Sequence, residues 1–309
     1  MKKIIIKEEN KNKRLDKFLA KEFFSYSRGE IASQIKIGKV LLNKKIVKPS
    51  YVLKINDNIE IFFPEKIITA LLSNSAVKLR IIHQDKNIIV VEKPAGISVH
   101  PASKNDEKNT LVNGLIAKFP EIIGVGDNLP ESNLRPGIVH RLDKETSGVI
   151  VIARNQKAFD QLKNLFKNRE VEKKYLALVL GKMPNKKGVI EKPLAKSSDY
   201  KKQVIANRRT RTKIKNAITE YTVLREFRDC SLLEISPKTG RTHQIRIHLA
   251  SVGHPVVGDK LYKSQEVSNL FPRHLLHASE ISFSLFGKKH SYKSPIPKDF
   301  KEFLAQLEK

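Results

Sequence analysis

Two uninterrupted runs of mainly β-branched residues constrain the fold of this 309-residue chain more than any other feature. Residues 88–91 read IIVV, and residues 149–153 read VIVIA. A strand exposed on one face alternates apolar with polar side chains, whereas a strand buried on both faces is apolar throughout. Both runs are therefore predicted to be buried strands inside a sheet.

Weaker patterns place other elements of this part of the chain, which we expect to form one domain over residues 79–309. Residues 156–167 carry apolar side chains at helical spacing, and residues 176–180 and 232–235 are further strand candidates. Residues 101–135 are rich in Asn, Asp, Pro and Gly, which predicts a long surface excursion.

A smaller module is predicted at residues 12–63, after an N-terminal extension at residues 1–11 and before a linker at residues 64–78. Two short helices should come first, because apolar residues recur at helical spacing and Ser27 with Glu30 forms a capping-box pattern. Short β-type runs should follow the helices, at residues 40–42, 46–47, 52–53 and 59–61.

The charge of the chain points to a polyanionic partner. It has 59 Lys and Arg against 32 Asp and Glu, a formal net charge of +27 and a pI near 10.0. Residues 1–63 alone hold 15 Lys and Arg against 7 Asp and Glu, a net charge of +8. Neutralising phosphates releases counterions, so a nucleic acid is the favoured partner. The alternative is a solvated, lysine-rich surface that binds nothing in particular.

The most informative polar stretch is RPGIVHRLDKETSGVIVIARN, residues 135–155. Its turn comes directly before the second buried strand and holds Asp143 between Arg141 and Lys144. Neighbouring positive charge keeps a carboxylate ionised, so Asp143 is a candidate nucleophile or base. Taken alone, the turn fits a structural Asx turn equally well.

A second polar stretch, PKTGRTHQIRIHLASVGHPVVGD at residues 237–259, concentrates arginine and histidine. Thr242 is the expected N-cap of a helix that stops at Gly253. Arg246 would flank the apolar face of this helix. Arginine suits a half-buried carboxylate partner, because its guanidinium gives two directed hydrogen bonds and stays charged.

Other chemistries lack their sequence patterns. His243 and His248 are five residues apart and no HExxH occurs, which argues against zinc. No G-x-S-x-G elbow, P-loop or dinucleotide-binding glycine motif is present, although a glycosidase-like pair of carboxylates stays open. Cys230 is the only cysteine, so no intrachain disulfide can form. No run approaches the roughly 18 apolar residues of a membrane span, so we expect a soluble, cytoplasmic protein without a membrane partner.

Both polar stretches resemble the RluA family of pseudouridine synthases. HRLDKETSG at residues 140–148 is similar to the family signature, and GRTHQIRIHL with GHPVVGD is similar to a later motif. Further similarities follow the expected order: VVEKPAGISVHP at 90–101, EKKYLALV at 172–179 and RHLLHA at 273–278. The resemblance implies an α+β fold, with a small S4-like αα-plus-β module before a synthase domain. That domain would hold a large mixed, mostly antiparallel sheet flanked by helices.

The resemblance also implies an enzyme that isomerises uridine in RNA without any cofactor or metal. Asp143 matches the catalytic aspartate, which either adds to the anomeric carbon of the sugar or acts as the base that opens the glycosidic bond. Tyr175 would stack on the extruded uracil and assist proton removal at C5. Arg246 would pair with Asp143 and hold it ionised. Arg141 and Leu276 would belong to the substrate pocket.

Residues 12–63 resemble the S4 RNA-binding domain, in the order RLDKFLA, SRGEIASQIKIGKVLLN, INDNIEI. In that family the two helices and the adjoining loop hold the RNA backbone. The positions expected at RNA, in this module and in the synthase domain, are Arg14, Arg28, Lys36, Lys39, Lys44, Arg241 and His243. The basic residues within 196–215 form either a second RNA contact or a solvated surface loop.

An S4-like module ahead of the synthase domain resembles the large-ribosomal-subunit synthases, and most nearly the RluD type. The expected partner is therefore structured RNA, either large-subunit rRNA or its ribosomal particle, bound by a monomer. The alternatives are an idle RNA-binding or ribosome-assembly factor, the same enzyme acting on other rRNA or tRNA uridines, and an unrelated hydrolase that releases uracil. Intact Asp143, Tyr175 and Arg246 disfavour the idle factor.

Overall fold

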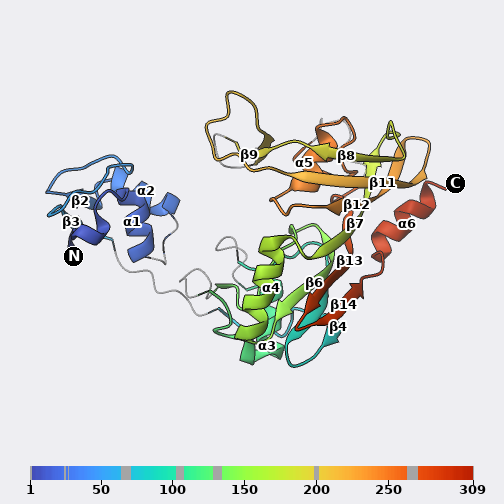
Figure 1. The fold of residues 1–309 in the computed structure, drawn as a ribbon, viewed down its shortest axis with the longest axis horizontal. Helices are drawn as coiled ribbons and strands as arrows, with labels where there is room; N and C mark the ends of the chain where they lie inside the picture. The colour runs from blue at the N-terminus through green and yellow to red at the C-terminus, as the bar shows by residue number, and fades with distance from the viewer. Residues whose placement is uncertain are drawn as a thin grey trace. The chain divides into compact units, whose positions relative to one another are not determined.

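The structure, a computed structural model, describes residues 2–23, 26, 28–63, 71–101, 108–127, 134–197, 202–262 and 271–308. The chain divides into two compact units, the first running to Leu71 and the second beginning at Leu72. Figure 1 draws the first in blue and the second in teal to red. Across the described ranges, no helix combines the length and the apolar character needed to cross a bilayer.

The first unit packs two short helices against a three-stranded antiparallel sheet in the order β1-β3-β2. Its elements are β1 (Lys2–Ile5), α1 (Leu15–Glu22), α2 (Arg28–Lys36), β2 (Val40–Leu42) and β3 (Asn58–Ile61). The helices bury Leu15, Leu19, Ile31 and Ile35 against the sheet. This confirms both predicted helices and the strands predicted at residues 40–42 and 59–61.

Other expectations for this unit are wrong. The predicted N-terminal extension contains β1, which pairs with the central strand β3 and so belongs to the module. Residues 46–47 and 52–53 lie outside the strands. Ile46 and Val52 are exposed, and Val52 forms only an isolated antiparallel bridge with Arg14, although Leu53 beside it is buried. Ser27, the predicted cap of α2, lies outside the described residues.

The second unit is built on a mixed sheet of nine described strands, in the order β4-β5-β6-β13-β7-β12-β11-β8, with β14 paired to β13. The strands are β4 (Arg80–Gln84), β5 (Ile88–Lys93), β6 (Ser147–Ala153), β7 (Glu172–Leu180), β8 (Lys187–Glu191), β11 (Ile218–Glu226), β12 (Cys230–Pro237), β13 (Leu276–Leu285) and β14 (Lys288–Lys293). Of these pairs only β6 with β13 is parallel. The predicted α+β fold with a mostly antiparallel sheet is confirmed.

Helices cover this sheet, and a separate hairpin lies beside it. These elements are α3 (Leu111–Lys118), α4 (Gln156–Asn168), β9 (Leu194–Lys196), β10 (Gln203–Ile205), α5 (Gln244–Ala250) and α6 (Lys298–Gln306). Figure 1 shows α4 beside β6, and the two are in contact. Every residue of β6 is buried, as the uninterrupted apolar run predicts.

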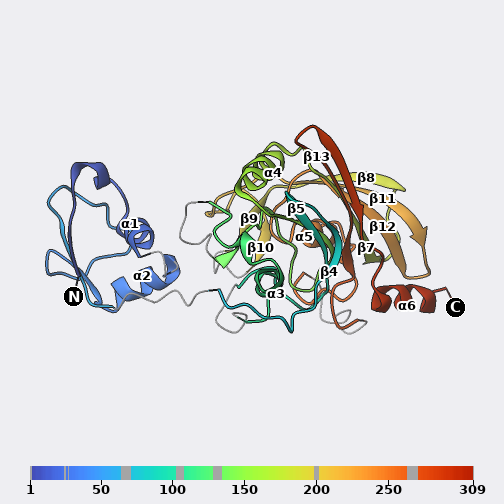
Figure 2. The same cartoon turned by 90° about the horizontal axis from the view of Figure 1, so that it is seen from below.

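Strand β7 shows how the two faces of the sheet are used. Ala177 and Val179 pack with Leu249 of α5, whereas Leu178 packs with Phe300 of α6. Because side chains alternate along a strand, α5 and α6 cover opposite faces. Figures 1 and 2 show the two helices on different sides of β7 and β12. Odd-numbered residues of β7 therefore face α5.

Helix α3 replaces part of the surface excursion predicted at residues 101–135. Thr110 and Asn113 form a capping box at its start, and the Asn113 side chain donates to the Leu72 carbonyl oxygen at 2.6 Å. Residues from Leu72 onward therefore belong to this unit and not to a linker. The composition was misleading because Asn113 and Gly114 are buried packing residues here, although their residue types are typical of loops.

Gly148, at the start of β6, predicts a large loss of stability on substitution. Its φ is +124°, and a Cβ there would lie 2.2 Å from the Ala278 carbonyl oxygen and 2.5 Å from the Ala278 nitrogen. Gly148→Ala should therefore lower the free energy of unfolding by about 3 kcal/mol, measured by urea denaturation. Gly240→Ala is the control, since nothing lies within 4 Å of its added Cβ. Equal stability of the two variants would contradict this packing.

Candidate active site

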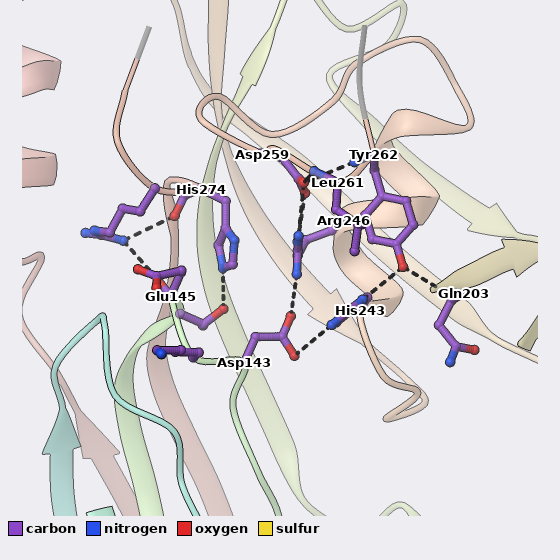
Figure 3. Close-up of polar contacts among 12 residues, drawn as sticks. Asp143, Glu145, Gln203, His243, Arg246, Asp259, Leu261, Tyr262 and His274 are labelled. Atoms are coloured by element: carbon purple, nitrogen blue, oxygen red, sulfur yellow. Dashed lines mark hydrogen bonds and ion pairs between the residues drawn. The ribbon is translucent and has the colours of Figure 1, made fainter. Parts of the chain in front are cut away.

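Asp143 lies in the turn that leads into β6, and its carboxylate faces two residues at the start of α5. The Arg246 Nη1 donates to Asp143 Oδ2 at 3.1 Å, and the His243 Nε2 lies 3.9 Å from Asp143 Oδ1. Figure 3 shows the carboxylate between these two side chains. The fold thus joins the two polar stretches that sequence analysis singled out, across 103 positions of the chain. Arg246 places a positive charge directly on the Asp143 carboxylate, as the family resemblance led us to expect.

Arg246 is shared by two carboxylates. Its Nε and Nη2 donate to the two oxygens of Asp259 at 2.7 and 3.0 Å, which leaves Nη1 for Asp143. Asp259 is fully buried and also accepts the backbone N–H groups of Leu261 and Tyr262. Burial acts to raise the pKa of Asp259, but the hydrogen bonds and the charge of Arg246 outweigh it and hold this pKa below its ordinary value. The guanidinium is therefore fixed in orientation before any substrate binds.

Sequence reasoning gave Asp259 no role, although it is the last residue of the quoted GHPVVGD segment. The only signal in the sequence was an acidic residue directly after a glycine in a motif otherwise rich in apolar residues. A pairing with Arg246, 13 residues earlier, could not be inferred from spacing.

His243 is the N-cap of α5, in the left-handed conformation with φ 55°. The expected N-cap, Thr242, is wrong by one residue, because the Gln244 side chain accepts the Arg241 N–H at 3.0 Å and holds the preceding turn outside the helix. The His243 Nδ1 lies 2.9 Å from the Tyr262 hydroxyl, which accepts the Gln203 N–H at 3.0 Å (Figure 3). Burial lowers the pKa of His243, and the charge of Asp143, which acts to raise it, does not outweigh burial. The neutral ring is therefore favoured.

A buried lysine anchors the turn that carries Asp143. Lys93 at the end of β5 is fully buried, and its Nζ donates to the carbonyl oxygens of Pro94, Ile97 and Lys144 at 2.7, 2.9 and 3.0 Å. Burial lowers the pKa of Lys93 to about 7. Since Lys144 directly follows Asp143, this lysine fixes the backbone on which the carboxylate sits. Lys93 lies within the quoted segment at 90–101 but was not recognised as a site residue.

Two histidines of the segment 273–278 hold the next part of the same turn. The His274 Nε2 lies 2.8 Å from the Thr146 hydroxyl (the His274 contact is drawn in Figure 3), and the His277 Nδ1 lies 2.9 Å from the Ser147 hydroxyl. Both rings are buried. The turn is therefore tied to β5 on one side and to β13 on the other.

His274 predicts a pH dependence of stability. Burial lowers its pKa to about 3 from an ordinary value of 6.5, so between these pH values the unfolded chain binds a proton that the folded protein does not. Acidification should therefore favour unfolding, by about 1.4 kcal/mol per pH unit for this group. His274→Gln should flatten the fall in unfolding free energy between pH 6 and 4, measured by urea titration. Thr146→Val keeps the histidine and should keep the wild-type slope; a His274→Gln slope equal to that of wild type would contradict the assignment.

A cavity of about 540 Å³ opens beside Asp143 on the face of the sheet that α5 covers. Tyr175 of β7 and Leu276 of β13 line it together with Asp143 and Arg246. Burial and the charge of Asp143 raise the pKa of Tyr175, so its phenol stays protonated. Arg141 is exposed and lines both this cavity and an adjoining one of about 390 Å³, and Asp143 also lies on both. A volume of this size suits an extruded nucleotide.

The predicted RNA-contacting residues lie in different environments. In the first unit, Arg14 and Arg28 donate to the buried carboxylate of Asp16, at distances from 2.8 to 3.1 Å. This fixes the two half-exposed guanidinium groups. In the second unit, the Arg241 Nε donates to the Asn216 carbonyl oxygen at 3.2 Å, and Arg241 lines the larger cavity with His243.

The remaining predicted positions, Lys36, Lys39 and Lys44, are exposed and form no ion pair within the described part of the first unit. The second basic segment includes strand β10, and its arginines at 208, 209 and 211 are exposed. Lys201, also in that segment, lies outside the described residues.

Two families of known proteins match parts of this chain. Residues 87–251 match the family described as RNA pseudouridylate synthase, and residues 13–59 match the S4 domain. The first range contains Asp143, Tyr175 and Arg246 but ends before Asp259 and Leu276.

Curated relatives span the whole chain. An uncharacterized RNA pseudouridine synthase, YlyB of Bacillus subtilis (strain 168), is 35% identical over 99% of this chain and 98% of its own length. Ribosomal large subunit pseudouridine synthase C of Buchnera aphidicola subsp. Acyrthosiphon pisum is 33% identical over 98% and 96%, and synthase D of Blochmanniella floridana is 32% identical over 100% and 99%. Human RNA Pseudouridylate Synthase Domain Containing 4 has a similar solved structure, with a TM-score of 0.59 and 28% identity over 74% of this chain and 93% of that chain. The chain belongs to the RluA family of RNA pseudouridine synthases, with an S4 domain ahead of the synthase domain.

Proposed function

We propose that this enzyme converts uridines of large-subunit rRNA to pseudouridine, with Asp143 as the residue that attacks the sugar or opens the glycosidic bond. The observation that carries the proposal is the Asp143 carboxylate, held by Arg246 at 3.1 Å on the wall of a nucleotide-sized cavity. Two relatives similar over nearly their whole length are named as large-subunit synthases, which supports rRNA as the substrate. The net charge of +27 supports a polyanionic one.

In this proposal each residue around Asp143 has a separate role. Arg246 orients Asp143, and Asp259 keeps Arg246 in place. Tyr175 stacks on the extruded uracil through its aromatic ring. Burial raises the pKa of its phenol, which therefore stays protonated at neutral pH. Leu276 supplies the apolar wall beside the base.

Basic residues of both units would bind the RNA. In the first unit, phosphates would be contacted by two arginines that Asp16 orients, Arg14 and Arg28, and by the exposed Lys36, Lys39 and Lys44. In the second unit, the nucleotide near the cavity would be contacted by Arg141, Arg241 and His243. Extrusion of a base requires unstacking, which the affinity for the backbone offsets. We propose that a monomer acts in the cytoplasm, on free rRNA or on a ribosomal particle.

Product analysis tests the proposal. After incubation with large-subunit rRNA, nuclease digestion and chromatography of the nucleosides should show pseudouridine appearing as uridine disappears, with no free uracil. Free uracil would identify a hydrolase. Unchanged nucleosides with retained binding of the RNA would identify a binding factor. Conversion of uridine in tRNA but not in rRNA would show that the protein is a pseudouridine synthase with tRNA as its substrate.

A further inference from the structure

Lys173 lines the same cavity as Asp143 and has no part in the proposed function. It precedes Tyr175 by two residues on β7, so both side chains project from the same face of the sheet. Both line the cavity of about 540 Å³. Lys173 is half-buried there, and burial lowers its pKa.

Within the described residues, the Lys173 side chain forms no hydrogen bond and no ion pair. Among the described residues that line this cavity, Asp143 is the only acidic one, and its carboxylate is already bonded to Arg246. His140 on the neighbouring wall is neutral, since burial and the charge of Lys173 lower its pKa to about 3. Lys173 therefore keeps an uncompensated charge in a partly desolvated position, which is unfavourable until an anion binds.

The adjacent residue makes the contrast clear. Lys174 projects from the opposite face of β7, and its Nζ lies 3.6 Å from the Glu234 Oε2. Two lysines next to each other in the chain thus differ in a single respect that matters here. One has a carboxylate partner within the protein, and the other points into the substrate cavity without one.

We infer that Lys173 binds a backbone phosphate next to the extruded uridine, an inference that rests on the proposed function. RNA carries a phosphate on each side of every nucleotide, so an extruded uridine brings anions to the walls of the cavity. Lysine binds phosphate as a point charge and needs no fixed angle of approach. The contact holds the sugar–phosphate backbone while Asp143 reacts at the sugar, which makes Lys173 a positioning residue.

The test compares Lys173→Met with Lys174→Met in the full-length protein. Tritium release from large-subunit rRNA with 5-tritiated uridine gives kcat and KM, and equilibrium binding of the same RNA is measured over a range of salt concentrations. Lys173→Met should raise KM about tenfold with little change in kcat. It should also make the dependence of log K on log salt shallower by about 0.7–0.9, the value for one phosphate contact. Lys174→Met should match the wild type, and Lys173→Arg should recover most of the affinity.

Other outcomes overturn the inference. Unchanged KM and salt dependence in Lys173→Met would show that no phosphate binds there. A collapse of kcat at unchanged KM would mean that Lys173 transfers a proton instead. If the wild type releases no tritium, the proposed function fails, and the binding curves decide the phosphate contact by themselves, because they need no turnover.

Discussion

Asp143→Asn should abolish pseudouridine formation while leaving the affinity for RNA intact. An amide has nearly the shape of the carboxylate and can still accept from Arg246, but it is neither a nucleophile nor a base. Tritium release should therefore fall by about a thousandfold or more, as when the nucleophile of other enzymes is removed. Binding of large-subunit rRNA should be equal or slightly tighter, because the variant loses one negative charge from the cavity.

Glu145→Gln is the matched control for this variant. Glu145 lies two residues further along the same turn, and its backbone carbonyl, not its carboxylate, accepts from Arg273. We expect this variant to keep tritium release within a few-fold of the wild type. Activity of Asp143→Asn above a tenth of the wild-type rate, or an equal loss in Glu145→Gln, would remove Asp143 from its proposed role.

Asp259→Ala should have the largest combined effect on stability and activity. It would leave the Arg246 guanidinium buried with two of its three bonded nitrogens unpaired, a change that costs about 3–5 kcal/mol of unfolding free energy. Without that anchor the Nη1 no longer points at Asp143, so kcat should fall about a hundredfold as well. Urea denaturation and tritium release measure the two effects on the same preparations.

Asp299→Ala controls for the loss of any Arg–Asp pair. Asp299 accepts two hydrogen bonds from Arg273 at 2.7 and 2.9 Å, the same bidentate geometry, but its side chain is 46% exposed. Water can reach the exposed side of that contact, and the buried Arg273 keeps its bonds to the carbonyl oxygens of Glu145 and His274, so the loss of stability should be smaller, about 2 kcal/mol. If Asp259→Ala were no more harmful to kcat than Asp299→Ala, the orientation of Arg246 by Asp259 would not matter for catalysis.

The sequence predicted elements well where burial alone dictates the residue pattern. β6 is apolar at nearly every position because both faces are covered, and α4 follows the apolar spacing that predicted it. α3 and β1 were missed for physical reasons. α3 uses Asn113 and Gly114 for buried contacts, although these residue types are typical of loops. β1 is an exposed edge strand paired with β3, so it has no buried apolar pattern that the sequence could show.

The site could be predicted only for residues to which a family motif assigns a role. The pairing of Asp143 with Arg246 was expected from the family resemblance, and the structure places them 3.1 Å apart. The roles of Lys93 and Asp259 could not be read in the same way, because their partners are set by the fold: backbone carbonyls for the lysine and a buried guanidinium for the aspartate. Buried polar groups of this kind have no periodicity in the sequence.

In the first unit, too, the fold sets contacts that the sequence did not predict. Arg14 and Arg28 were predicted as RNA contacts from the resemblance to the S4 domain and from their charge, and both also bond to the buried Asp16. Burial acts to raise the pKa of Asp16, and the two arginines outweigh it and lower the pKa below its ordinary value. Only the folded module shows that these guanidinium groups are held in place before RNA binds.

Tritium release from large-subunit rRNA by the wild-type protein shows whether this enzyme forms pseudouridine there. Isomerisation exchanges the hydrogen at C5 of uridine for the bond to the sugar, so each event frees one tritium atom. We expect release that reaches a plateau at a small whole number of uridines per RNA and is absent with Asp143→Asn. No release from free rRNA or from a ribosomal particle, by a protein that still binds both, would contradict it.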